Sequence, residues 1–181
     1  EAAKTKAEKY FGSWPAGKTP EYEYAFPKGV DNTSVAFIDK SGAVQSVINI
    51  TYALDLKPGA PDVIPARVMN TILGSGFSGR LFKNLREDKA YTYGAYSSLD
   101  DDELVGNFSA NASVRNEVTD SAITQFFLEL DKLRNEPVSQ EELDLAKSFI
   151  AGGFARSLES PQTVAGFALN IDMYDLPADY Y

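Results

Sequence analysis

Apolar residues alternate along the first part of the chain with the period of β-strands. Two such runs, over residues 34–39 and 45–54, are joined through the turn-forming pair Ser41-Gly42. In the second run one face carries the apolar side chains of Ile48, Ile50, Tyr52 and Leu54, although Val47 on the opposite face makes the alternation imperfect. The pattern predicts a β-hairpin whose second strand turns one face toward a core.

Helical spacing follows on both sides of the glycine-rich stretch GSGFSG at residues 74–79. The segment that enters the stretch has one helical face made of Val68, Met69, Ile72 and Leu73. The segment that leaves it has an apolar side made of Leu81, Phe82 and Leu85, and it is expected to end near Lys89. The spacing therefore predicts two helices joined by a glycine-rich loop.

A second hairpin and a helical C-terminal third complete the pattern. Strands are predicted over residues 91–99 and 104–114, around an acidic, solvated tip at 100–103. The second of these strands directs one set of apolar side chains to the same face, namely Leu104, Phe108, Ala110, Ala112 and Val114. The next helix has an amphipathic stripe of Val118, Ala122, Ile123, Phe126, Phe127 and Leu130. Ser139 and Glu142 form a capping box that starts another helix, and Pro161 starts a third.

The predicted elements run β-β-α-α-β-β-α-α-α, with neighbouring strands paired rather than separated by crossover helices. This order is typical of an α+β fold, an antiparallel sheet with helices packed on one face. Residues 1–14 are interpreted as the tail of a preceding helix, and residues 15–21, which contain proline and glycine, as a linker. The domain itself is expected over residues 22–181, as a piece of a longer protein.

The stretch GSGFSG has the G-x-G-x-x-G spacing of a dinucleotide-binding loop. Such a loop needs a strand before its first glycine, a helix after its last and an acidic residue further on, and Asp100 lies at a suitable distance. Because a helix is predicted before Gly74, nucleotide binding is only a distant alternative. Gly74, Gly76 and Gly79 are expected instead to supply turns of positive φ and close helix contacts.

Composition removes several classes of function. The chain has 181 residues, with 17 Lys and Arg against 26 Asp and Glu, and its net charge of −9 argues against nucleic acid as a partner. It contains neither histidine nor cysteine, which excludes histidine acid–base chemistry, thiolate nucleophiles and zinc sites with nitrogen or sulfur ligands. The acidic tip departs from the EF-hand pattern, because Val105 and Asn111 stand where that calcium loop needs Gly and Glu. The sequence has no apolar run long enough to span a membrane.

Arg86 and Tyr93 are the remaining candidates for chemistry. Their R-x6-Y separation places Arg86 in the last turn of a predicted helix and Tyr93 in the strand that follows. If the chain reverses between these elements, both side chains reach one point, and a guanidinium and a phenol both donate hydrogen bonds, as a developing oxyanion requires. An arginine at a helix end and a tyrosine in a strand are also common without any activity, so the spacing alone leaves both interpretations open.

The stretch NTILGSGFSGRLFKNLREDKAYTYGAYSS resembles the signature of the C-terminal domain in the pitrilysin/insulinase family of inverted zinc peptidases, which includes mitochondrial processing peptidase and bacterial relatives. Further matches are EKYFGSWP, SGAVQSVINI, the EEL helix and SLESPQTVA, so the resemblance covers nearly the whole chain. It implies a clamshell of paired α+β domains. In that arrangement one half binds zinc through an H-x-x-E-H motif, and the opposing half supplies an arginine and a tyrosine.

This resemblance implies roles for individual residues. Arg86 and Tyr93 would contact the substrate backbone and help to stabilise the tetrahedral intermediate, and Phe82 would line the pocket for the residue after the cleaved bond. Many relatives carry Gly-Leu before Ala-Tyr or Gly-Tyr, whereas this chain has Lys89-Ala90-Tyr91-Thr92. The departure leaves the spacing from arginine to tyrosine intact but makes Tyr91 a competitor for the role of the phenol.

The chain carries no H-x-x-E-H motif. It is therefore expected to hold neither a metal nor another cofactor, and to be inactive in isolation as one half of a metalloendopeptidase that acts on peptides. Zinc is expected in a partner domain, either on the same polypeptide or on a separate chain. The alternative is a non-catalytic scaffold or assembly subunit of the same fold. The resemblance favours a periplasmic over a cytoplasmic location.

Overall fold

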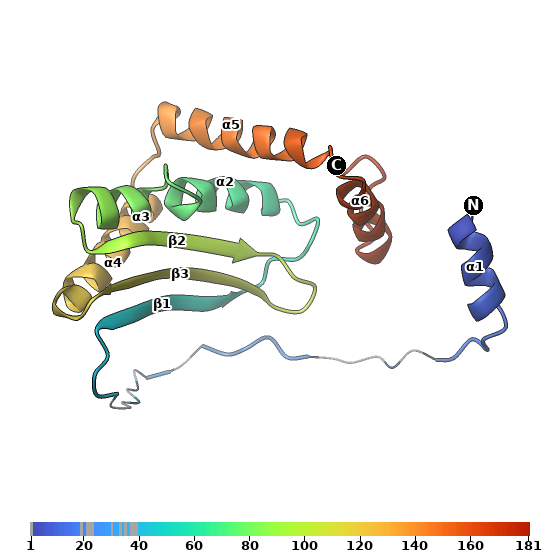
Figure 1. The fold of residues 1–181 in the computed structure, drawn as a ribbon, viewed down its shortest axis with the longest axis horizontal. Coiled ribbons are helices and arrows are strands. Elements are labelled where there is room, and N and C mark those ends of the chain that lie inside the picture. Colours follow the sequence, from blue (N-terminus) through green and yellow to red (C-terminus); the bar gives the residue numbers. More distant parts are fainter. Residues whose placement is uncertain are drawn as a thin grey trace.

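The computed structural model describes residues 2–18, 20, 24–29, 31–32, 34, 36 and 40–181. Within these residues the chain forms an antiparallel sheet of strand order β1-β3-β2, built from β1 (Gln45–Leu54), β2 (Thr92–Asp100) and β3 (Gly106–Arg115). β1 pairs with one edge of β3 and β2 with the other. The central strand β3 therefore joins the earlier strand to the later hairpin (Figure 1).

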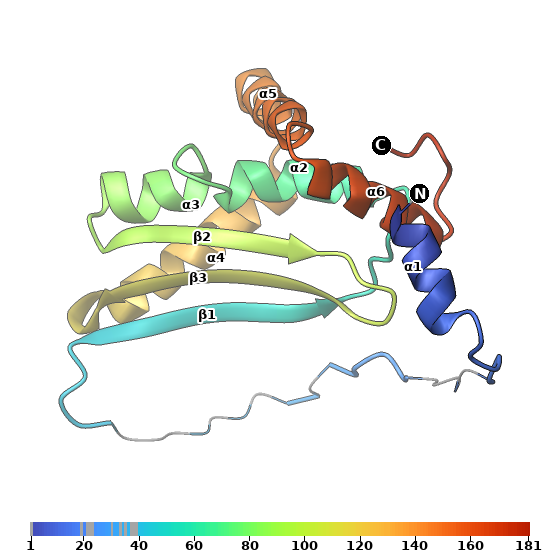
Figure 2. The ribbon, with the colours of Figure 1, turned by 45° about the vertical axis from the view of Figure 1, so that its right-hand side comes forward.

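Helices cover one face of this sheet (Figures 1 and 2). They are α2 (Val63–Gly74), α3 (Arg80–Phe82) with its continuation η1 (Lys83–Asp88), the short turn η2 (Asn116–Val118) and α4 (Thr119–Asn135). α5 (Gln140–Ser157) packs on α2 and leads into α6 (Pro161–Met173), and α1 (Ala2–Phe11) precedes the sheet in sequence. The predicted α+β fold is confirmed. None of the described helices is long and apolar enough to cross a bilayer.

The core lies between the sheet and the helices because β3 alternates strictly. Its inward side chains are the buried Phe108, Ala110, Ala112 and Val114, whereas the residues between them are polar. The helices meet this face with the buried side chains of Leu73, Leu81, Leu85, Ala122 and Phe126. The face predicted for β3 is confirmed from Phe108 onward, and so is the apolar side of the helix after the glycine-rich loop.

One part of the predicted hairpins is not tested by the structure, and one residue differs from the prediction. The strand predicted over residues 34–39 falls mostly on residues outside the described ranges, so its pairing with β1 stays a prediction. Leu104 does not share the buried face of β3, because it precedes the strand and is 54% exposed. The cause is Asp102, whose carboxylate accepts the backbone N–H groups of Leu104 and Val105 at 2.8 and 3.1 Å and turns the chain there. These hydrogen bonds also lower the pKa of Asp102.

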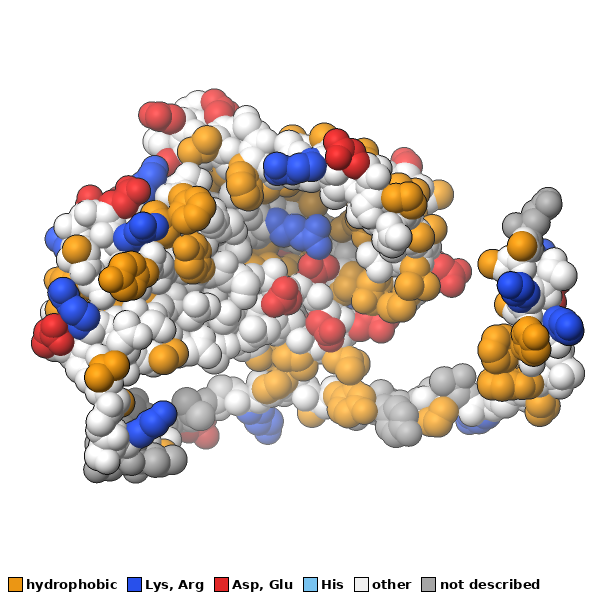
Figure 3. All heavy atoms as spheres, viewed as in Figure 1, with side chains coloured by type: hydrophobic (Ala, Val, Ile, Leu, Met, Phe, Trp, Pro, Cys, Tyr) orange, Lys and Arg blue, Asp and Glu red, His pale blue; other side chains and the backbone are white. Residues whose placement is uncertain are grey.

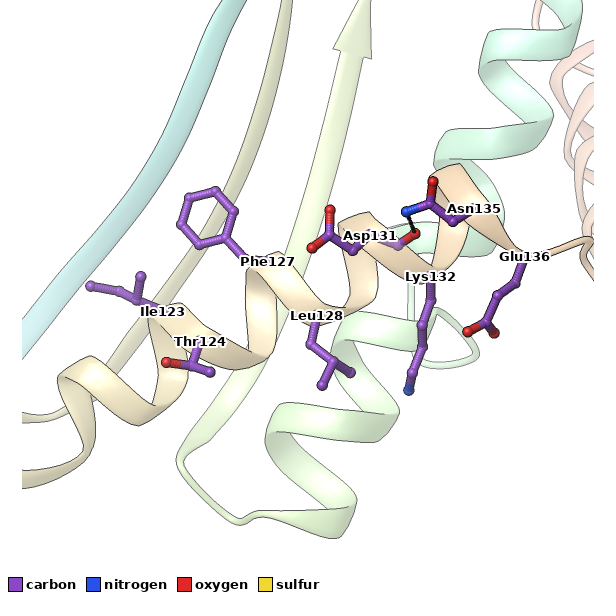
Figure 4. Close-up of a pocket in the computed structure, with 8 residues that line it drawn as sticks. All are labelled: Ile123, Thr124, Phe127, Leu128, Asp131, Lys132, Asn135 and Glu136. Atoms are coloured by element: carbon purple, nitrogen blue, oxygen red, sulfur yellow. Dashed lines mark hydrogen bonds between the residues drawn. The ribbon is translucent and has the colours of Figure 1, made fainter. Parts of the chain in front are cut away.

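The predicted apolar stripe of α4 is only partly buried. Ala122 and Phe126 face the core, but Ile123 and Phe127 are exposed. Both belong to an open depression of about 600 Å³ along α4, in which Phe127 and Leu128 project from opposite flanks of the helix (Figure 4). The predicted stripe is wider than the buried face of α4, because a helix that lies on a sheet buries only the side chains nearest the sheet.

The acidic tip between β2 and β3 is tied to the rest of the domain rather than freely solvated. Asp101 accepts a hydrogen bond from Nη2 of Arg67 on α2 at 2.9 Å, and its side chain is only 16% exposed. The backbone N–H of Asp102 donates to the carbonyl of Leu56 at 3.0 Å. These hydrogen bonds therefore connect the tip of the hairpin to α2 and to the segment that follows β1.

Hydrophobic side chains stay exposed on the two long C-terminal helices. They include Leu145 and Phe149 on α5 and Val164, Leu169 and Met173 on α6. In the surface view, hydrophobic side chains gather at the end of the domain that carries α6 (Figure 3). Exposed apolar surface of this kind is typical of contact sites with other protein.

Candidate functional site

The stretch GSGFSG connects two helices, as the sequence predicts. α2 ends at Gly74 and α3 begins at Arg80, so the strand that a dinucleotide loop requires is not there: a described helix takes its place. Gly76 has φ +78°, which a side chain would strain. A Cβ on Gly74 would lie 2.5 Å from the backbone nitrogen of Ser97, and one on Gly79 would lie 2.8 Å from Cα of Gly74. The glycines therefore serve a turn and two close approaches, and nucleotide binding is discarded.

The helix that leaves the loop changes its winding before it reaches Arg86. α3 continues into η1, a π-helical segment in which the N–H of Lys89 donates to the carbonyl of Asn84 at 3.0 Å. The N–H of Tyr91 then closes the helix on the carbonyl of Leu85 at 2.9 Å. Wide turns of this type are rare and occur frequently at functional sites. Arg86 thus lies in an unusual backbone segment at the C-terminal end of this helix.

Arg86 is exposed, and its guanidinium lies over an aromatic ring. The Cζ atom of Arg86 is 4.8 Å from the ring centroid of Phe82, one turn earlier on the same helix. A guanidinium over an aromatic face is attracted by the ring quadrupole and is thereby held in place. The positive group is therefore both fixed and open to a ligand.

Tyr93 lies where β2 departs from regular pairing. The register of β2 against β3 shifts between Thr92 and Ala95, which is the mark of a β-bulge. Tyr93 lies within this shift and is 87% exposed. Its competitor Tyr91 is half-buried and packs against the hydrophobic core, so the phenol more open to a ligand is that of Tyr93. Among the described residues no hydrogen bond joins Tyr93 to Arg86, and the role of both side chains stays a prediction.

Phe82 lies deeper than its predicted role implies. It is 2% exposed, with Phe77 at 5.0 Å and Tyr96 at 5.9 Å between ring centroids. The accessible rings at this position are those of Phe77, 71% exposed, and Tyr96, 37% exposed. Sequence reasoning missed both. The only local signal was an aromatic residue inside a glycine-rich loop, and nothing local marks Tyr96. We refer to Phe77, Phe82, Arg86 and Tyr96 as the aromatic cluster.

A buried polar network fastens the helix of Arg86 to α4. Nδ2 of Asn84 donates to Oε1 of Glu129 at 2.6 Å and to Oε1 of Gln125 at 3.1 Å. Glu129 is 5% exposed and also accepts from Nζ of Lys132 at 3.1 Å. A buried carboxylate needs such partners, because its burial without them would be costly. The network therefore fixes the π-helical segment on which Arg86 is carried.

Arg80, at the start of the same helix, forms a two-pronged ion pair with α5. Its Nε and Nη2 atoms donate to the two carboxylate oxygens of Glu142 at 2.7 and 2.9 Å. Glu142 also accepts from the backbone and hydroxyl of Ser139, so the predicted capping box is confirmed. The hydrogen bonds from Arg80, followed by those from Ser139, lower the pKa of Glu142 to about 2.

Glu142→Gln is expected to lower the free energy of unfolding at pH 7 by about 1–2 kcal/mol, a value reduced for the partial exposure of the pair. The folded-state pKa lies below the ordinary value of 4.5, so the contribution is complete above about pH 4.5 and is lost as the pH falls toward 2. Urea unfolding of both proteins at several pH values measures this. The exposed neighbour Glu141 supplies the control Glu141→Gln, and a difference between wild type and Glu142→Gln that does not shrink with acidification would refute the assignment.

Ala90 ends the helix of Arg86 in a conformation that suits glycine. Its φ is +53°, a left-handed value that costs a residue with a Cβ roughly 1–2 kcal/mol. When the Gly-Leu-Ala-Tyr pattern of many relatives is aligned on Tyr93, its glycine falls on Ala90. The alanine that stands here in place of glycine is therefore a point of backbone strain close to the candidate site.

Ala90→Gly is expected to stabilise the chain by about 0.5–1 kcal/mol, since relief of the strain exceeds the added entropy of the unfolded chain. Thermal unfolding measures this, with Ala151→Gly at an exposed interior position of α5 as the control that should destabilise. A lower melting temperature for Ala90→Gly would show that Ala90 does not adopt this conformation.

The candidate site has no means of binding a catalytic metal. The sequence contains no histidine or cysteine, and within the described ranges no group of three or more acidic side chains is placed to hold an ion. What the site offers is a set of hydrogen-bond donors and aromatic surface. Such a set can orient and stabilise a bound polar group.

Comparison with known proteins places the chain in a family. The family model described as the peptidase M16 inactive domain matches residues 1–150. An uncharacterized zinc protease of Bacillus subtilis, YmxG, is 28% identical over 108 residues, which cover 58% of this chain and 26% of that protein. The chain thus spans about a quarter of the length of this curated relative.

Solved structures show the same fold. A crystal structure of a peptidase M16 inactive domain from Pseudomonas fluorescens has a TM-score of 0.68 and 28% identity, and the match covers 76% of this chain and 32% of that one. The periplasmic protease PqqL from Escherichia coli matches 98% of this chain and 20% of its own, with a TM-score of 0.73 and 18% identity. The second likeness supports the fold alone.

Proposed function

The chain belongs to the peptidase M16 family, in which it corresponds to the inactive domain, and on that premise we propose that it is the non-zinc half of a zinc-dependent endopeptidase. In this role it binds a peptide substrate and stabilises the tetrahedral intermediate of peptide-bond hydrolysis. The observation that carries the proposal is the pair of exposed donors: Arg86 fixed over Phe82 at a π-helical turn, and Tyr93 projecting from the bulge of β2.

The chemistry assigned to this chain is electrostatic. When a peptide carbonyl is attacked, negative charge develops on its oxygen, and donors already in position lower the barrier. The guanidinium of Arg86 and the phenol of Tyr93 would donate to that oxygen or to the adjacent peptide backbone. Because Arg86 is held over Phe82 before the substrate arrives, little energy would be spent on its reorientation.

The sequence has no histidine or cysteine, and the described residues include no group of acidic side chains that could hold a metal, so the proposal requires a second half that carries zinc. That half would be another domain of the same polypeptide or a separate chain. The exposed apolar side chains of α5 and α6 are compatible with such a neighbour, because exposed apolar surface is typical of sites where one protein domain contacts another. Substrates would be peptides or unfolded segments, because a backbone-directed site needs an extended chain.

Peptidase activity on an unstructured quenched-fluorescent peptide tests the proposal. The chain alone is expected to be inactive, and the protein that joins it to its zinc half is expected to hydrolyse the peptide in a chelator-sensitive manner. A complete, zinc-loaded protein that folds yet cleaves no peptide would instead support a scaffold or assembly role for this domain.

A further inference from the structure

Tyr96 belongs to the same cluster as Arg86, although no sequence signal marks it. Both side chains lie close to the ring of Phe82. The ring centroid of Tyr96 is 5.9 Å from that of Phe82, and Cζ of Arg86 is 4.8 Å from the Phe82 centroid. Because Phe82 is 2% exposed, it serves as a buried support for both. Tyr96 and Arg86 are therefore both partly or fully exposed side chains that share Phe82 as a neighbour.

The hydroxyl of Tyr96 also lies at the bulge that carries Tyr93. A Cβ on Gly94 would fall 2.7 Å from the hydroxyl oxygen of Tyr96 and 2.7 Å from its Cε2 atom. The phenol is thus folded back over the backbone of Gly94, next to Tyr93 and inside the register shift. Tyr96 is in this way the one side chain of the aromatic cluster that links Phe82 to the bulge of Tyr93.

The phenol of Tyr96 is available for a ligand. The side chain is 37% exposed, and among the described residues its hydroxyl has no hydrogen-bond partner. The hydroxyl of a partly buried tyrosine usually forms a hydrogen bond, because an unpaired hydroxyl is costly where access to water is restricted. A donor that shares Phe82 with Arg86 and that the domain itself does not use is therefore suited to a bound molecule.

We propose that Tyr96 is a further substrate-binding residue, whose hydroxyl donates a hydrogen bond to a backbone carbonyl of an extended peptide bound across Arg86 and Tyr93. This inference rests on the proposed function. An extended peptide presents carbonyl groups in succession, so a site that binds its backbone needs more than one donor. Arg86 at the end of one helix, with Tyr93 and Tyr96 at the start of the strand that follows, would supply these donors.

The first test is Tyr96→Phe, which keeps the ring on Phe82 and removes only the hydroxyl. Binding of a short fluorescein-labelled peptide of alanine, glycine and phenylalanine to the full chain is measured by fluorescence anisotropy. The loss of one hydrogen bond is expected to weaken binding about three- to tenfold, with an unchanged melting temperature. Tyr52→Phe is the matched control, because Tyr52 is an exposed strand tyrosine whose ring packs on Phe108, outside the aromatic cluster.

Gly94→Ala provides a second, independent variant. The new methyl group would collide with the end of a flexible side chain, so it should displace the Tyr96 hydroxyl without unfolding the strand. The expected loss of peptide binding is similar to that of Tyr96→Phe. In the double variant the two losses should not add, because both act through one hydroxyl.

The outcomes separate this inference from the proposed function. If Arg86→Ala weakens peptide binding while Tyr96→Phe and Gly94→Ala bind as wild type does, Tyr96 is not a substrate contact and the proposed function stands. If Tyr96→Phe and Tyr52→Phe lose binding equally, the effect is not specific to the site and the inference fails. If the wild-type chain binds no peptide and the complete protein cleaves none, the proposed function falls and the role of Tyr96 falls with it.

Discussion

Arg86→Ala, in the protein that joins this chain to its zinc half, is expected to lower kcat for peptide hydrolysis by roughly a hundred- to a thousandfold. Removal of one preorganised donor to an oxyanion typically raises the barrier by roughly 2.7–4 kcal/mol. Arg86 fits that role because the ring of Phe82 and the π-helical turn fix its position before substrate binds. The measurement is steady-state kinetics on an unstructured quenched-fluorescent peptide, with zinc content and folding confirmed for each variant.

Two further variants make the Arg86 result specific. Lys83→Ala removes an exposed cation from the same helix. It is expected to leave kcat unchanged, because the effect of Arg86→Ala is attributed to the loss of a positioned donor and not to the loss of one positive charge. Arg86→Lys keeps the charge but loses the planar fork that can donate to two acceptors, and it should recover only part of the activity. Equal kcat values for Arg86→Ala and wild type would end the assignment of Arg86 to the transition state.

The elements around the site were predictable because their signals are local. The alternation of β3 and the helical spacing on both sides of GSGFSG each lie within one short window, and both are confirmed. The capping box of Ser139 and Glu142 is likewise confirmed, since both residues belong to a single helical turn. The loop was interpreted correctly in two respects, because the helix before it excludes a nucleotide loop and Gly76 has a positive φ. The close approach of Gly74, however, is to Ser97 of β2 and not to a helix.

What the sequence could not predict depends on contacts between distant segments. Arg80 and Glu142 are far apart in the chain, as are Asn84 and Glu129, so no spacing rule connects them. The π-helical winding of η1 is set by how the helix ends on Leu85 and Ala90, and local propensity does not encode it. The burial of Phe82 beneath Phe77 and Tyr96 has the same origin, because it requires the loop and β2 to meet over one helix.

Gly74→Ala is expected to lower the free energy of unfolding by about 3 kcal/mol, at the upper end of the range for an overpacked site. The new Cβ would lie 2.5 Å from the backbone nitrogen and 2.5 Å from the hydroxyl oxygen of Ser97, and the backbone of β2, which is paired with β3 at this point, cannot move aside cheaply. Ser97 is itself held there, because its hydroxyl donates to Oδ1 of Asn70 at 2.7 Å and its carbonyl accepts from Nδ2 of Asn70 at 3.4 Å. α2 and β2 would have to separate to admit one methyl group.

Gly152→Ala is the matched control for this variant. Gly152 lies in the interior of α5, and a Cβ there would meet no heavy atom within 4 Å. The substitution should therefore stabilise the chain by about 0.5–1 kcal/mol through helix propensity alone. Urea unfolding of the three proteins measures both effects. Changes of opposite sign in the free energy of unfolding would show that the contact of α2 with β2 requires the first glycine of GSGFSG. A Gly74→Ala protein as stable as wild type would mean that this contact is looser than described and that the glycine needs another explanation.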